Sequence, residues 1–171
     1  PRHCPRLFRH LIQFFLLCVA IGSRDLYAEK VRYVVDGDTL ILENNQRVRL
    51  IGLDAPEVAH QKYRRKGDPF GEQAKRYLRD LIQGEEVELK AGHEPFDQFG
   101  RRLAYVYLPD GTFVNRKLVE DGYAETFRKY PFEYKREFFE LERKARAQKR
   151  GMWFQKPKSW QDSFHEFLER L

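Results

Sequence analysis

Residues 48–57 read Val48-Arg49-Leu50-Ile51-Gly52-Leu53-Asp54-Ala55-Pro56-Glu57, an apolar run with one arginine inside it and two carboxylates around a proline at its end. Burying either kind of charge without a partner would cost several kcal/mol. The arginine therefore requires an anion, and the carboxylates require a cation. The segment predicts a strand that ends where a metal ion and a phosphate meet.

The residues on both sides of this run predict a small sheet. Residues 31–35 and 39–42 are rich in β-branched and aromatic side chains, and a polar turn at residues 43–46 connects them to the run. We expect three antiparallel strands in this half of the chain. Two further strands are expected at residues 87–90 and 103–108.

Hydrophobic spacing predicts three helices in the domain and one beyond it. The first covers residues 71–82, a short second helix ends at Gly122, and the third covers residues 133–150. Residues 156–171 are expected to form a C-terminal helical extension with an apolar stripe. We expect this stripe to dock on its own domain, with a partner or a membrane as the alternative.

Composition is compatible with one globular domain. The 171 residues are 42% hydrophobic and 15% aromatic, which is enough to fill a core. The formal net charge of +6 favours an acidic partner, such as nucleic acid or an anionic surface.

Residues 1–28 have the layout of a secretory signal peptide, which predicts a secreted or periplasmic protein. Three arginines precede a weakly polar to apolar run, and cleavage is expected after Ala28, with Gly22 as the alternative. A buried N-terminal helix and an uncleaved membrane anchor are the competing interpretations, although the run is short for a bilayer. Both cysteines, Cys4 and Cys18, lie in this segment. Its removal would exclude disulfides and thiolate sites from the mature chain. It would also remove four Lys or Arg and one Asp or Glu, which lowers the net charge from +6 to +3.

Asp36 and Asp38 flank a glycine at the expected bend between two strands. This pattern alone is ordinary turn chemistry. Together with Asp54 and Glu57 it gives four carboxylates near the ends of adjacent strands, and no His or Cys clusters with them. Hard oxygen ligands favour Ca²⁺ or Mg²⁺ over Zn²⁺. Metal-assisted hydrolysis is therefore the enzyme class that the residues favour.

Arg49 could hold a phosphodiester bidentately beside a carboxylate-bound cation and stabilise the charge that develops when water attacks. Arg101, in the loop after Asp97, is the expected second cation. The alternative is that both arginines are structural and pair with Asp or Glu inside the sheet.

The chain resembles the staphylococcal-nuclease, or thermonuclease, family in six short motifs. They occur in the family's order between about residues 30 and 154, and the ordered set is specific although each motif alone is weak. They are Val35-Asp36-Gly37-Asp38-Thr39, Arg49 to Glu57, Gly71-Glu72-Gln73-Ala74, Asp97-Gln98-Phe99-Gly100-Arg101, Leu103-Ala104-Tyr105-Val106 and Gly151-Met152-Trp153.

This resemblance implies an α+β domain at residues 29–155, a five-stranded OB-fold barrel with three helices. It implies a monomeric Ca²⁺-dependent phosphodiesterase that acts on DNA and RNA, leaves 3′-phosphate ends and needs no stable protein partner. By position, Asp38, Asp54 and the Ala55 carbonyl resemble the calcium ligands, with Asp36 farther from the metal. Glu57 resembles the residue that orients or deprotonates water, Arg49 and Arg101 the phosphate clamp, and Tyr130 a substrate-binding tyrosine.

Several positions depart from the family pattern. Ala55 stands where a threonine is usual, and Gln98 and Phe99 replace a lysine and a tyrosine that contact a terminal phosphate. Arg128 stands where a second binding tyrosine is expected. We expect the chemistry to persist while terminal-phosphate binding, base stacking and end preference differ.

A non-catalytic OB-type nucleic-acid-binding module is the alternative function. The complete set of Asp38, Arg49, Asp54, Glu57 and Arg101 favours the enzyme, because binding alone would not require it. The basic loop at residues 60–68 could follow a nucleic-acid backbone, and a solvated loop is an equal alternative.

Overall fold

The computed structural model describes residues 28–59 and 67–154. The leader up to residue 27, residues 60–66 of the basic loop and the C-terminal extension from residue 155 lie outside the described residues. The interpretations that depend on them stay predictions. None of the helices in the described ranges is both long and apolar enough to cross a membrane.

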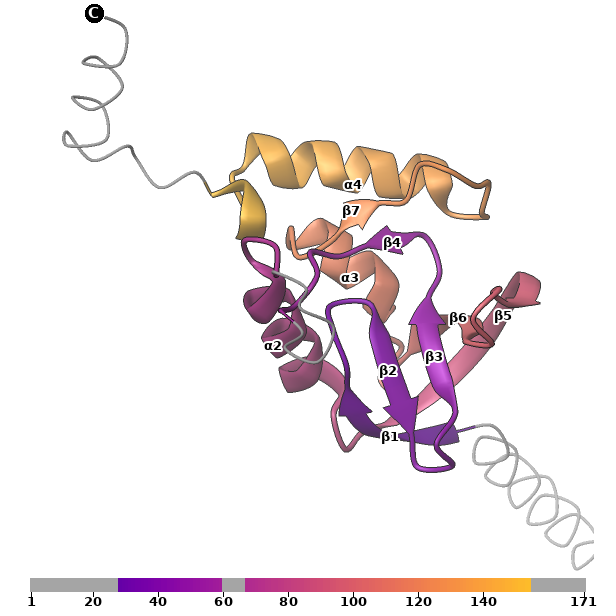
Figure 1. Cartoon of the computed structure of the whole chain (residues 1–171). Coiled ribbons are helices and arrows are strands. Elements are labelled where there is room, and N and C mark those ends of the chain that lie inside the picture. Colours follow the sequence, from indigo (N-terminus) through magenta and orange to yellow (C-terminus); the bar gives the residue numbers. More distant parts are fainter. Residues whose placement is uncertain (1–27, 60–66, 155–171) are drawn as a thin grey trace, which may run out of the picture.

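In the described part of the chain, five strands form a closed barrel in the order β1-β2-β3-β6-β5 (Figure 1). Their bounds are Ala28–Val34 (β1), Thr39–Leu42 (β2), Arg47–Leu50 (β3), Glu86–Phe96 (β5) and Arg102–Tyr107 (β6). Neighbouring strands are antiparallel except β3 and β6, which are parallel, and the β1–β5 pair closes the barrel. The predicted five-stranded OB-fold barrel is confirmed.

A second, very small sheet lies beside the barrel and was not predicted. It pairs β4 (Leu53–Asp54) with β7 (Glu125–Thr126), so that Asp54 lies opposite Glu125. Strands of two residues carry no measurable periodicity, which explains why the sequence pattern does not reveal them.

Three helices pack against the sheets, as predicted. They are α2 (Gly71–Ile82), α3 (Val114–Glu120) and α4 (Lys135–Ala147), and a short 3-10 helix, η2, covers Gly151–Trp153. The α2 bounds match the prediction, whereas α4 is shorter than the predicted 133–150. In Figure 1, α4 runs along β7, above the end of the barrel where β3 leads into β4.

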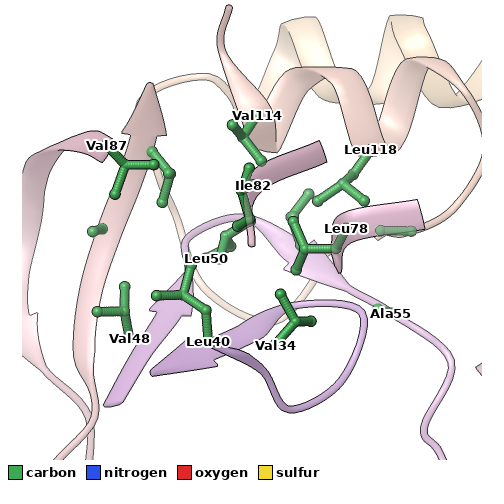
Figure 2. Close-up of a cluster of buried hydrophobic side chains, with 14 of the residues drawn as sticks. Val34, Leu40, Val48, Leu50, Ala55, Leu78, Ile82, Val87, Val114 and Leu118 are labelled. Carbon is green, nitrogen blue, oxygen red and sulfur yellow. The ribbon is translucent and has the colours of Figure 1, made fainter. Parts of the chain in front are cut away.

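The buried core joins the strands to α2 and α3. Figure 2 shows side chains from these elements meeting in one cluster: Val34, Leu40, Val48, Leu50, Leu78, Ile82, Val114 and Leu118. Fully burying each such side chain contributes about 1.5–3 kcal/mol. This packing fixes α2 against the barrel, and with it the segment that leads from β4 into α2.

Candidate functional site

Asp38 lies buried at the bend between β1 and β2, at the end of the barrel. Its Oδ1 accepts a hydrogen bond from Arg49 Nη1 at 2.6 Å, and its Oδ2 accepts one from the Ala55 backbone N–H at 3.1 Å. Burial raises the pKa of Asp38 to about 7, even though the positive charge of Arg49 acts to lower it. The carboxylate is therefore held where it prefers either a proton or a nearby cation.

The glycine of the Asp36-Gly37-Asp38 bend allows a close approach between this bend and Ala55. A Cβ at Gly37 would lie 2.6 Å from the Ala55 Cβ, which is too close for two carbon atoms. Asp36 Oδ1 accepts a hydrogen bond from the Asp38 N–H at 3.1 Å, which stabilises the bend. The pattern that looked like ordinary turn chemistry therefore also serves to bring Asp38 to Ala55.

Arg49, on β3, lies between two carboxylates. Besides Asp38, its Nη2 lies 3.9 Å from an Asp54 carboxylate oxygen and donates to the Leu53 carbonyl at 3.3 Å. The alternative that Arg49 pairs with an acidic residue is thus observed. The same geometry shows that the two carboxylates converge on one cation.

Asp38, Asp54 and Ala55, the three predicted metal-binding positions, are brought together by these contacts. Asp54 extends from β4 with 63% of its side chain exposed, so it can reach a solvent ion. Two carboxylates and a carbonyl are hard oxygen donors that fit Ca²⁺. Within residues 28–59 and 67–154, no group of three or more His, Cys, Asp and Glu side chains could hold a metal ion. The expected donor set contains only two such side chains.

Glu57 lies on the loop after β4 and is half-buried. Its backbone N–H donates to the Asp68 carboxylate at 3.1 Å, and its carbonyl accepts from the Asp68 N–H at 2.8 Å. The chain thus returns to Glu57 just before α2 begins.

Arg101 follows a tight turn that Asp97 organises. Its Nε donates to Asp97 Oδ2 at 2.7 Å, and Asp97 Oδ1 accepts from the backbone N–H groups of Phe99 and Arg101. Burial acts to raise the pKa of Asp97, but the hydrogen bonds from Arg101 and Phe99 outweigh it and hold this pKa below its ordinary value. Arg101 is therefore held by a carboxylate that stays charged at neutral pH.

An open cleft of about 1350 Å³ runs over β3, β5, β6 and the segment at residues 127–133. Four predicted site residues line it, namely Arg49, Glu57, Arg101 and Tyr130. The predicted metal-binding residues Asp38, Asp54 and Ala55 are not among its lining. The lining of the cleft thus includes Arg49 but not the two carboxylates that Arg49 contacts.

Phe96 and Lys129, which were not predicted as site residues, also line this cleft. Phe96 belongs to the last part of β5, which runs six residues past the predicted end at residue 90. Phe96 is half exposed, and Phe99 is 73% exposed with its ring 5.4 Å from the Arg101 guanidinium. An aromatic residue directly before the Asp97 motif was the signal that could have revealed Phe96.

Arg128 does not line the cleft. It pairs with Glu142 at 2.8 Å and with Glu125 at 3.2 Å. Its charge is thus paired with carboxylates of β7 and α4, whereas Tyr130 lines the cleft and is 57% exposed. The arginine that replaces the expected tyrosine at this position therefore has acidic partners within this chain.

Comparisons with known proteins agree with these features. The sequence model of the family described as "Staphylococcal nuclease homologue" matches residues 47–155. A thermonuclease of Staphylococcus intermedius is 39% identical, with 60% of this chain and 62% of that protein covered. A micrococcal nuclease of Shigella flexneri is 34% identical, with 80% of both chains covered. Endonuclease YhcR of Bacillus subtilis is 32% identical over 74% of this chain, which corresponds to 11% of that longer protein. The chain thus spans less than two thirds of the first and third of these relatives.

Proposed function

Since the chain belongs to the staphylococcal nuclease family, we propose that it is a calcium-dependent nuclease that hydrolyses phosphodiester bonds of DNA and RNA and leaves 3′-phosphate ends. The observation that carries this proposal is the convergence of Arg49, Glu57 and Arg101 on one cleft. The carboxylates of Asp38 and Asp54 both lie within 3.9 Å of the Arg49 guanidinium. The names of the relatives, thermonuclease and micrococcal nuclease, support the same activity.

In this proposal, Arg49 and Arg101 bind the phosphate from the barrel side of the cleft. The Asp97 contact uses Nε of Arg101, so within the described part of the chain its terminal N–H groups remain available to a phosphate oxygen. A guanidinium can grip two phosphate oxygens at once, and it stabilises the negative charge that grows as the phosphorus accepts a fifth oxygen.

Glu57 takes the proton from the attacking water. It lines the same cleft as the two arginines, and Pro56 stiffens its connection to Asp54. The half-buried position keeps the carboxylate near the phosphate while water still reaches it.

The Asp38 and Asp54 carboxylates with the Ala55 carbonyl would hold the calcium ion. When bound, the ion neutralises phosphate charge and lowers the pKa of a coordinated water. Arg49 lies within 3.9 Å of both carboxylates, so the calcium ion would share these two side chains with the guanidinium that binds the phosphate.

We further propose that the protein is secreted or periplasmic, with residues 1–28 as its signal peptide and no protein partner required for activity. N-terminal sequencing of the protein recovered outside the cytoplasm tests this. A mature chain that begins at Glu29 or Ser23 would support the proposal, and an intact leader would contradict it.

One observation favours a non-catalytic nucleic-acid-binding module instead. Arg49 and Arg101 each already have a carboxylate partner, as structural arginines would. In such a module, exposed Phe96, Phe99 and Tyr130 would stack bases and the arginines would only stabilise the barrel.

The test is to incubate the purified chain with DNA and RNA oligonucleotides, with Ca²⁺ or with excess chelator, and to analyse the product ends. Calcium-dependent cleavage to 3′-phosphates supports the enzyme. Metal-independent binding without cleavage would support the module. Glu57→Gln should remove most turnover while calcium binding persists. Glu94→Gln, which lies at the exposed edge of the same cleft, is the matched control.

A further inference from the structure

Glu57 and Asp68 are joined by two hydrogen bonds, and this pair is called the clasp below. Asp68 belongs to none of the six sequence motifs. The Glu57 N–H donates to Asp68 Oδ2 at 3.1 Å, while the Asp68 N–H donates to the Glu57 carbonyl at 2.8 Å. Both backbone groups of Glu57 are therefore bound to one residue eleven positions later. This fixes the backbone of Glu57 from a second point, in addition to its connection to β4.

The clasp is tightened by a glycine. A Cβ at Gly71 would lie 2.2 Å from the Glu57 carbonyl oxygen and 2.7 Å from its carbon. Both of these are backbone atoms, so they cannot turn aside as a flexible side chain could. Only glycine allows the first residue of α2 to come this close to Glu57.

The clasp connects Glu57 to a rigid element. Gly71 N–H donates to the Asp68 carbonyl at 3.1 Å, and α2 is anchored in the core by Ala74, Leu78 and Ile82. The position of Glu57 thus depends on the packing of α2 as well as on the short strand β4.

The Asp68 carboxylate does not serve α2 as a cap. The residue at the start of α2, Phe70, has a left-handed backbone, and no side chain caps the helix there. An aspartate at the N-cap would ordinarily accept a hydrogen bond from the first turn, but Asp68 lies two positions before the N-cap residue Phe70. Here the carboxylate accepts the Glu57 N–H instead, which separates its role from ordinary helix capping.

We infer that Asp68 is a positioning residue, which holds Glu57 at the distance from the phosphate-binding arginines that catalysis requires. The inference rests on the proposed nuclease function. Asp68 is exposed, so the hydrogen bond itself contributes little to the stability of the fold. Its effect on Glu57 placement is larger, because a displacement of about 1 Å can cost about 100-fold in rate.

The test compares Asp68→Ala and Asp68→Asn in the full chain, with Asp80→Ala as a matched control on the exposed side of α2. With a DNA oligonucleotide and Ca²⁺, Asp68→Ala should lower kcat by about 10- to 100-fold and leave KM nearly unchanged. Asp68→Asn should recover most of this loss, because its amide oxygen can accept the Glu57 N–H. Calcium affinity, measured by calorimetry without substrate, should stay the same in all three variants.

Amide hydrogen exchange provides a reading that does not depend on activity. The Glu57 N–H should exchange faster in Asp68→Ala than in the wild type, and at the wild-type rate in Asp80→Ala. If the wild type is active and Asp68→Ala has the same kcat and the same Glu57 exchange rate as the wild type, the positioning role of Asp68 is overturned, while the proposed nuclease function stands. The same conclusion follows if Asp68→Asn loses as much activity as Asp68→Ala. A wild type without calcium-dependent cleavage would instead refute the proposed function.

Discussion

Replacement of Glu142 by glutamine tests whether one buried carboxylate holds β7 in place. Glu142 extends from α4 with only 4% of its side chain exposed. Its Oε2 accepts the Thr126 N–H at 2.9 Å, and its Oε1 accepts hydrogen bonds from Arg128 and Arg146. Burial acts to raise the pKa of Glu142, but the hydrogen bonds from Thr126, Arg146 and Arg128 outweigh it and lower this pKa.

The expected loss in the free energy of unfolding follows from the number of hydrogen-bond donors around the Glu142 side chain. Glutamine keeps the shape, but its amide NH₂ would face a donor from Thr126 or from an arginine. Removing one partner of a buried ion pair costs about 3–5 kcal/mol. Arg128 and Arg146 are 53% and 45% exposed and can turn to water, so we expect about 2–3 kcal/mol.

Urea unfolding followed by tryptophan fluorescence at pH 7 measures this loss. Glu140→Gln, at an exposed position of α4, is the control and should change stability by less than about 0.5 kcal/mol. The difference between wild type and Glu142→Gln should shrink as the pH falls below 4.5, because the lowered pKa stabilises the fold only while the carboxylate is charged. A loss no larger than that of Glu140→Gln, or one that persists unchanged at low pH, would refute this reasoning.

Three further experiments probe the site. In excess chelator, the free energy of unfolding should fall as pH rises from 3.8 to about 7, because burial raises the pKa of Asp38 and the folded protein keeps a proton that the unfolded chain releases. Asp38→Asn should remove up to about 4 kcal/mol of this decrease in urea titrations, and an identical pH dependence in the variant would contradict the assignment. Gly71→Ala should lower stability by about 1–3 kcal/mol because its Cβ would meet the Glu57 carbonyl at 2.2 Å, and an unchanged urea midpoint would count against that contact. Arg101→Lys should lower kcat/KM by roughly tenfold or more, since a point charge cannot serve both Asp97 and a phosphate. Arg102→Lys, which pairs with Glu29 outside the cleft, is its control, and equal losses in the two variants would contradict the clamp.

The parts of the fold with strong periodicity could be predicted from the sequence. Helix α2 has its buried residues three or four apart along one face, and its bounds match the expectation. Strand β5 was predicted to end at residue 90, but it continues to Phe96, and its alternation of buried and exposed residues stops at Lys90 and Ala91. That final part leaves the core, so its residues carry no signal of a strand.

The candidate site was harder to predict because its contacts join residues that only the closed barrel brings together. The sequence shows that Arg49 needs an anion, but Asp38 and a phosphate are both compatible with that requirement. The 2.6 Å contact depends on how β3 pairs with β2, which places Asp38 beside it. Similarly, the motif that contains Glu57 gives no indication of Asp68, since the clasp closes across an intervening segment.

The β1–β5 pairing that closes the barrel has a consequence for the order of folding. Ala28 pairs with Glu88, sixty positions later, whereas β1, β2 and β3 are joined by short turns. Closing a long loop costs more chain entropy than forming neighbouring hairpins. During synthesis the meander of β1, β2 and β3 can therefore form early, whereas the β1–β5 pairing can form only after β5 has left the ribosome. Residues 28–30, whose strand partners lie on β5, are thus the last part of β1 to join the sheet.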